Sequence, residues 1–195
     1  MWILNKNFIL ILALFFAAFI GVFYANNAEV SNKRHSFELE KARLTPKNNF
    51  DFSVNGMKIE SGGGGLGKIN LSDLLSLKKT SVLLDKNVHI SEKDFNLYAK
   101  EVEYNPFEKT GIAKGEVLVE GRDFFFSGKD ASLEGTSAGL TLNLQNINGV
   151  ALGSPFTADK ISYNIDTKQL SSDNSVIHIW KIPIMWLPSI SIELN

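Results

Sequence analysis

The pattern of apolar and polar residues divides the chain into three parts. Residues 8–24 carry no charge, residues 25–49 are polar with mixed charge, and from Phe50 onward short apolar alternations are separated by Gly, Asn and Asp. As a helix, the first stretch would extend roughly 26 Å at about 1.5 Å per residue, near the lower limit for crossing a bilayer. The pattern therefore predicts a single transmembrane helix in residues 1–25, a polar linker over residues 26–49 and a β-domain over residues 50–195.

The flanks of the apolar stretch favour an uncleaved anchor. Trp2 and Tyr24 bracket it, as aromatic residues at membrane interfaces do. The alternatives are a cleaved signal peptide and a buried core helix. Signal cleavage needs small residues at positions −3 and −1 of the cut, and a cut after Ala25 would place Phe23 at −3. The basic residues on either side leave the orientation open, because long domains cross membranes largely regardless of charge.

Alternation with a period of two is typical of half-buried β-strands and recurs through the domain. The clearest examples are GLTLNLQNING from Gly139, GEVLVEG from Gly115 and SVIHIWK from Ser175. Each predicts a strand with one apolar face, and turn residues separate these runs. The residues predicted for these faces are Leu140, Leu142, Leu144, Val117, Val119, Ile177 and Ile179. One segment, LSDLLSLKK at residues 71–79, instead predicts a short helix or a strand-connecting turn.

Three segments of the domain resemble one another. LYAKEVEY, FSGKDASL and FTADKISY start at Leu97, Phe126 and Phe156, which are 29 and 30 residues apart. A period in this range indicates a repeated supersecondary unit. With two strands per unit, each repeat would add one step to a continuing antiparallel sheet.

Composition and charge exclude several kinds of chemistry. The chain has no cysteine, which excludes disulfides, thiol catalysis and cysteine-rich metal sites. His35, His89 and His178 stand far apart and show no metal-ligand spacing. The net charge of −1 and the scarcity of basic pairs argue against nucleic-acid binding. We therefore expect a protein that is not an enzyme, with no metal and no cofactor.

The stretch SGGGGLGKIN partly matches the phosphate-binding loop G-x-x-x-x-G-K-[ST]. Gly62, Gly67 and Lys68 fit the motif, but Ile69 stands where a hydroxyl should hold Mg²⁺. The chain that follows indicates antiparallel strands, whereas a phosphate loop opens a parallel βαβ unit. A nucleotide-dependent protein is therefore the weakest hypothesis, and the four consecutive glycines instead predict a mobile hinge beside residues 71–79.

The repeat resembles the A-(x)4-Y-N…G-x-V-x-V pattern of the OstA-like domain. The matching residues are Ala99, Tyr104, Asn105, Gly115, Val117, Val119, Ala158, Tyr163 and Asn164. This domain occurs in the periplasmic bridge proteins of lipopolysaccharide transport (the Lpt family) and in the N-terminal part of the outer-membrane lipopolysaccharide assembly protein. The ending IWKIPIMWLPSIS, with Pro183 and Pro188, is similar to the stretch that follows the domain in the assembly protein. The N-terminal anchor matches the layout of the inner-membrane bridge component.

The resemblance implies a fold and a function. The fold is an all-β, open, V-shaped antiparallel β-jelly roll, anchored in the inner membrane with its domain in the periplasm. The function is a non-catalytic carrier of lipopolysaccharide or a similar glycolipid. The expected partners are other bridge proteins, joined edge to edge by β-strand pairing, and an inner-membrane ABC transporter. The candidate acyl-chain-binding residues are Val117, Val119, Phe124, Phe126, Leu140, Leu142, Leu144, Ile161, Tyr163, Ile177 and Ile179.

A second hypothesis belongs to a different class. An anchored β-domain could dock partner domains through its edges as a structural adaptor and carry no lipid. The same apolar residues would then form an ordinary core, because a core and a lipid groove use the same residue types.

Overall fold

The computed structural model of the protein describes residues 6–47, 50–54, 56–66, 81–136, 139–179 and 182–193. Within these residues it consists of one N-terminal helix and a single antiparallel sheet. The helix α1 spans Lys6–Leu44. The strands are β1 Phe50–Val54, β2 Met57–Leu66, β3 Val82–Glu92, β4 Phe95–Ala99, β5 Glu101–Asn105, β6 Thr110–Lys114, β7 Val117–Glu120, β8 Phe124–Gly128, β9 Ala131–Thr136, β10 Gly139–Ala151, β11 Ser154–Asn164, β12 Gln169–Ile179 and β13 Ile182–Glu193.

Eight strands of the sheet form a closed ring. They pair in the order β10-β8-β7-β4-β3-β5-β6-β9, and β9 pairs again with β10. β11, β12 and β13 continue from the other edge of β10, and β2 and β1 continue from β3. All of these pairs are antiparallel. The prediction of an all-β, antiparallel domain after an N-terminal apolar helix is therefore confirmed.

The ring has two layers because its long strands bend in the middle. β3 pairs with β4 through Val88–Glu92 and with β5 through Val82–Leu84. β10 likewise pairs with β9 in its first part and β8 in its second. We call β4, β7 and β8, with the adjoining parts of β3 and β10, the helix-side layer. The far layer is β5, β6 and β9 with the remaining parts of β3 and β10.

Both bends have left-handed backbone. Lys86 and Asn87 in β3 have φ of 58° and 69°, and Asn146 in β10 has φ of 53°. The amide N–H of Asn87 donates to the carbonyl of Lys100, which separates β4 from β5. Left-handed backbone is tolerated best by Gly and Asn, so Asn87 and Asn146 suit these corners, whereas Lys86 gives no such signal in the sequence.

The first two repeat segments each join two short strands, β4 to β5 and β8 to β9, whereas the third lies within β11. The Tyr-Asn dipeptides of the repeat have a structural reason. The Asn105 side-chain oxygen accepts hydrogen bonds from the N–H groups of Phe107 and Glu108 (3.0 and 3.1 Å). Asn164 does the same for Asp166 and Thr167, at 3.1 and 2.9 Å. Such Asx turns reverse the chain after a strand. The preceding tyrosine of each pair is buried in the main core.

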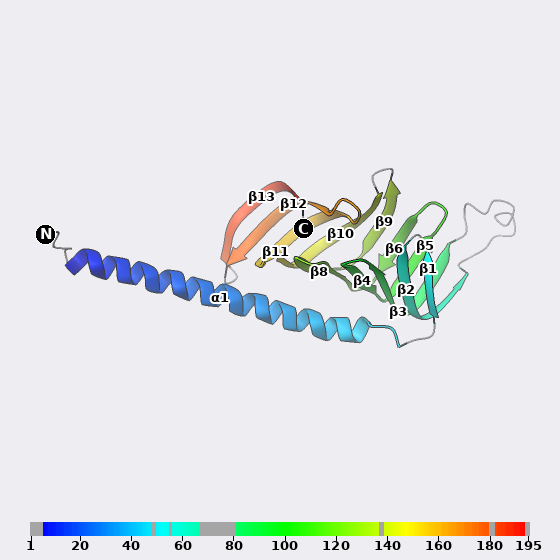
Figure 1. Ribbon diagram of the computed structural model, residues 1–195, viewed down its shortest axis with the longest axis horizontal. Coiled ribbons are helices and arrows are strands. Elements are labelled where there is room, and N and C mark those ends of the chain that lie inside the picture. Colours follow the sequence, from blue (N-terminus) through cyan, green and yellow to red (C-terminus); the bar gives the residue numbers. More distant parts are fainter. Residues whose placement is uncertain are drawn as a thin grey trace.

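The predicted polar linker is largely helical. Residues 26–44 belong to α1, which continues without a break from the apolar segment. Figure 1 shows α1 running along the stack of strands, with its N-terminal half projecting beyond β13. Val30, Phe37 and Leu44 recur every seven residues on the helix and pack against the sheet. Their contact with the sheet is the physical reason why this segment is not a solvated spacer.

The glycine run is a strand in the part that the structure describes. Residues 62–65 lie in β2, where Gly63, Gly64 and Gly65 pair with Asp85, Leu84 and Leu83. The prediction of a mobile hinge is therefore wrong for these residues. A β-carbon at Gly62 would lie 2.2 Å from the carbonyl oxygen of Lys86, so the glycine permits a close approach of two backbones. Gly67, Lys68, Ile69 and residues 71–79 lie outside the described residues.

Candidate functional site

The predicted lipid-binding residues gather in the interior of the sheet. Eight of them, in β7, β8, β10 and β11, are buried in one apolar cluster, whereas Leu140 of β10 and Ile177 of β12 are partly buried against it. The side chain of Ile179 lies outside the described ones. The buried members are Val117, Val119, Phe124, Phe126, Leu142, Leu144, Ile161 and Tyr163.

This apolar cluster extends along almost the whole stack of strands. It begins at Met57 and Ile59 in β2, passes through both layers of the ring and reaches Leu170 in β12, with Ile192 of β13 packed against it. Since side chains alternate between the two faces of a strand, one face of each strand from β2 to β13 supplies it. The interior is therefore continuous across the ring and the added strands.

Aromatic rings form a row within this interior. The ring centroids of Phe124 and Phe126 lie 5.0 Å apart, and those of Phe126 and Phe156 lie 5.9 Å apart. Tyr163 packs edge-on against Phe124 at 5.0 Å and stacks on Phe95 at 5.9 Å. Such offset and edge-to-face contacts are favourable beyond the apolar area that they bury.

A small opening lies over this row of rings, where the β3–β4 and β7–β8 turns approach the β11–β12 turn. It has a volume of about 20 Å³, room for about one water molecule, and Phe124 and Tyr163 form its floor. Charged residues surround it: Asp94, Arg122, Asp123 and Lys168. Burial, and secondarily the charge of Asp94, raises the pKa of the Tyr163 hydroxyl, so this group stays neutral at physiological pH. We call this opening the mouth.

The interior is chemically suited to apolar ligands and is filled by its own side chains. Val117 and Leu144 have 0% and 1% of their surface exposed, so an acyl chain could enter only if side chains or layers moved apart. The aromatic rings at the mouth are the first groups that such a ligand would displace.

The sheet has two edges that remain open among the described residues. In this part of the chain, β13 pairs only with β12 and β1 only with β2. Open edges present unpaired N–H and C=O groups that can accept a strand from another chain. Pro183 and Pro188 lie in β13, as is usual for proline in an edge strand.

A second apolar contact joins α1 to the outer surface of the helix-side layer. Phe37 and Leu44 of α1 are buried against a patch of the sheet, and the centroids of the Phe37 and Phe125 rings lie 5.1 Å apart. The sheet residues of this patch are Tyr98, Leu118, Phe125 and Val150. We call this contact the helix interface.

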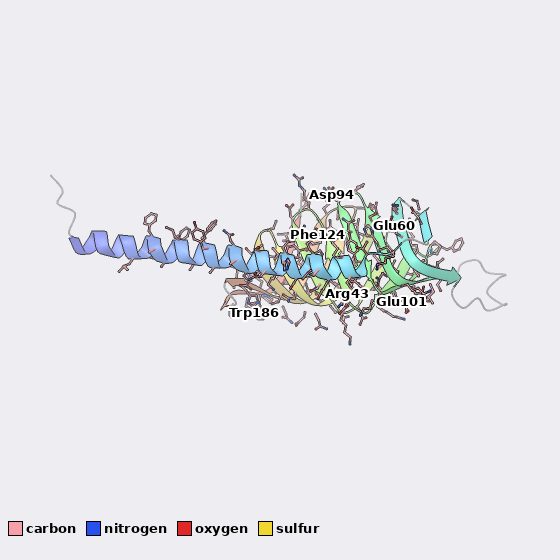
Figure 2. The ribbon with its side chains drawn as sticks, turned by 90° about the horizontal axis from the view of Figure 1, so that it is seen from below. Arg43, Glu60, Asp94, Glu101, Phe124 and Trp186 are labelled. Carbon is pink, nitrogen blue, oxygen red and sulfur yellow. The ribbon has the colours of Figure 1, made fainter. Side chains whose placement is uncertain are left out.

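Ionic contacts surround the helix interface. Glu120 accepts from Arg34 at 2.7 Å through one carboxylate oxygen and from Lys41 at 2.7 Å through the other. Burial lowers the pKa of Lys41, but the hydrogen bond to Glu120 and nearby negative charges raise it more, so the net shift is upward. At the end of the helix, the Asn87 side chain donates to the carbonyl of Arg43 at 2.8 Å. Figure 2 shows α1 lying across this face of the sheet, with Arg43 near its domain end.

Between α1 and the sheet lies a cavity of about 770 Å³, open to solvent. Ala25, Ala28 and Ser36 line it from the helix, and Thr157 and His178 line it from β11 and β12. Lys33 also borders it and donates to the side-chain oxygen of Asn148. Partial burial lowers the pKa of Lys33, although the charge of Glu29 opposes this shift.

The helix interface was not predicted from the sequence, although the sequence contains a signal for it. The alternation of GEVLVEG placed Leu118 opposite Val117 and Val119, and the run of three phenylalanines at residues 124–126 necessarily turns Phe125 outward. An apolar residue on the outer face of a strand needs a cover, and the seven-residue spacing of Val30, Phe37 and Leu44 provides one.

The described residues contain no group of three or more His, Asp or Glu side chains that could hold a metal ion. Helix α1 is long and apolar enough to cross a membrane. Compared with known proteins, the sequence matches no family model and no curated protein.

Proposed function

We propose that this protein is a membrane-anchored periplasmic carrier of lipopolysaccharide or a similar glycolipid in the export bridge, most like its inner-membrane component. The observation that carries the proposal is the apolar interior, which runs without interruption from β2 to β13 and ends at two open sheet edges. A carrier that hands lipid from domain to domain needs both features. The resemblance of the repeat to the OstA-like domain supports the same function.

Binding in such an interior requires no catalysis. Burying one acyl CH₂ group is worth about 0.8 kcal/mol. An acyl chain with many CH₂ groups therefore gains enough free energy on burial to displace some side-chain contacts of the interior. We infer that the two layers separate at the mouth into an open V-shaped β-jelly roll when lipid enters. An inner-membrane ABC transporter would supply the lipid, and the next bridge protein would pair with a free edge.

Photocrosslinking tests the proposal directly. A photoreactive amino acid at Val119 or Leu142, both buried in the interior, should form adducts with lipid in cells that export lipopolysaccharide. The matched control is Ile112, which is 47% exposed and alternates with the buried Gly111 and Ala113, so it faces outward. Adducts to protein alone at both interior positions would refute the carrier.

The second candidate is an assembly adaptor that docks partner β-domains without carrying lipid. The close packing of the interior favours it, because a filled core needs no ligand. Photoreactive residues on β1 or β13 would then capture partner domains, while Val119 and Leu142 would yield no lipid adducts.

A further inference from the structure

The last hairpin of the sheet carries almost no charge. Between Asp173 and Glu193 the sequence contains a single charged residue, Lys181. On β13, Met185 and Trp186 are 50% and 65% exposed. These two residues are consecutive, so their side chains lie on opposite faces of β13 and both faces of this edge strand expose a large apolar side chain. Exposed apolar side chains on an uncharged edge strand indicate a contact surface rather than an ordinary solvated edge.

This hairpin lies beside the point where α1 leaves the sheet. His178 of β12 lines the same cavity as Ala25 and Ala28 of α1, and Pro183 of β13 pairs with His178. Ala25 directly follows the apolar stretch that ends at Tyr24. The end of the hairpin is therefore level with the boundary between the apolar and the polar part of the helix, as Figure 1 shows.

Trp186 stands on the same face of the sheet as α1. It pairs with Val176, which pairs with Thr157, and Thr157 lines the cavity under the helix. Directly opposed residues of paired strands share one face. Figure 2, seen from the helix side, shows Trp186 at the end of the sheet beyond which the helix projects.

We propose that residues 183–186 rest on the surface of the phospholipid membrane that α1 crosses, with the indole of Trp186 at the interface. Tryptophan prefers this depth because its ring is apolar while its N–H needs a polar partner. Exposed Phe23 and Tyr24 of α1 would lie in the same plane. The strand stack would then stand on the membrane with β13 nearest to it and β1 remote. This inference rests on the proposed membrane anchor.

Fluorescence quenching by brominated phospholipids tests the contact in the full-length protein. The chain has three tryptophans, so Trp2→Phe with Trp180→Phe leaves Trp186 as the reporter. Two matched proteins start from the variant in which all three are phenylalanine. Phe19→Trp reports the anchor, and Phe107→Trp reports an exposed site in the β5–β6 turn, among strands distant from β13. Each is reconstituted in phosphatidylcholine–phosphatidylglycerol vesicles, and far-ultraviolet circular dichroism confirms its β-content.

We expect Trp186 to lose most of its emission to bromines placed near the headgroup and less to bromines near the bilayer centre. The Phe19→Trp protein should show the opposite depth preference, and the Phe107→Trp protein should show little quenching. Quenching at position 19 but not at Trp186 would overturn the contact and leave the anchor intact. Equal quenching at positions 107 and 186 would mean general adsorption and would also overturn it. If neither Trp186 nor position 19 is quenched, the anchor itself is refuted.

Discussion

At the residue scale, Glu120 is the acid that holds α1 against the sheet. Its two oxygens accept from Arg34 and Lys41, and its side chain is only 12% exposed. Glu120→Gln keeps the size but removes the charge, so both basic partners lose a charge-assisted hydrogen bond. We expect the free energy of unfolding to fall by about 1–2 kcal/mol, measured by chemical denaturation.

Glu116→Gln is the matched control for this variant. Glu116 also meets two basic side chains, Arg43 and Lys100, but its side chain is 43% exposed. These partners lower the pKa of the Glu116 carboxyl, yet water screens exposed pairs and makes them weak. The loss of stability should therefore be clearly smaller than for Glu120→Gln. Equal losses would show that burial at the helix interface does not matter.

At the element scale, the glycines of β2 differ in how much room they have. A β-carbon at Gly62 would lie 2.2 Å from a backbone oxygen of β3, whereas one at Gly64 would first meet the flexible end of Leu84, at 3.1 Å. We expect Gly62→Ala to cost about 1–3 kcal/mol, because the backbone must shift, and Gly64→Ala to cost much less. Thermal unfolding followed by circular dichroism compares the two. A mobile hinge would instead tolerate both changes equally.

The docked half of α1 makes a second prediction at this scale. Phe37 is 4% exposed in the helix interface, so Phe37→Ala should cost about 3 kcal/mol of packing and release this part of the helix. Leu39 is 61% exposed on the same helix and serves as the control. Limited digestion with trypsin, which cuts after Lys33 and Arg34, should be faster for Phe37→Ala and unchanged for Leu39→Ala. Equal rates in both variants would argue against docking.

The sequence predicts the strands better than it predicts what covers them. Strict alternation identified the inward positions of β7 and β10, because a strand with one buried face must repeat every two residues. Docking of α1 was not predictable in the same way. Its patch on the sheet combines Tyr98, Leu118, Phe125 and Val150 from four different strands, which only the folded sheet brings together. The corner at Lys86 also gives no signal, since lysine rarely adopts positive φ.

At the scale of the whole molecule, the chain has two apolar compartments separated by the helix-side layer. Phe124 and Phe125 are neighbours in β8 but belong to different compartments, the interior and the helix interface. The predicted lipid residues all belong to the interior wherever their side chains are described. The sequence could thus predict which face is apolar, but not that the interior is closely packed, because packing depends on how far the two layers approach.

This separation gives a test of the proposed carrier within one dipeptide. Phe124→Ala and Phe125→Ala each remove a buried ring, so each should cost about 3–5 kcal/mol of stability. Of the two phenylalanines only Phe124 lines the mouth, where its loss removes the edge-on contact with Tyr163 and widens the way into the interior. Tyr163 would then keep only its stacking on Phe95. At a temperature where both variants remain folded, a fluorescent long-chain acyl probe should therefore bind faster to Phe124→Ala than to Phe125→Ala. Identical binding rates would mean that acyl chains do not enter through the mouth, and binding by neither variant would favour the adaptor.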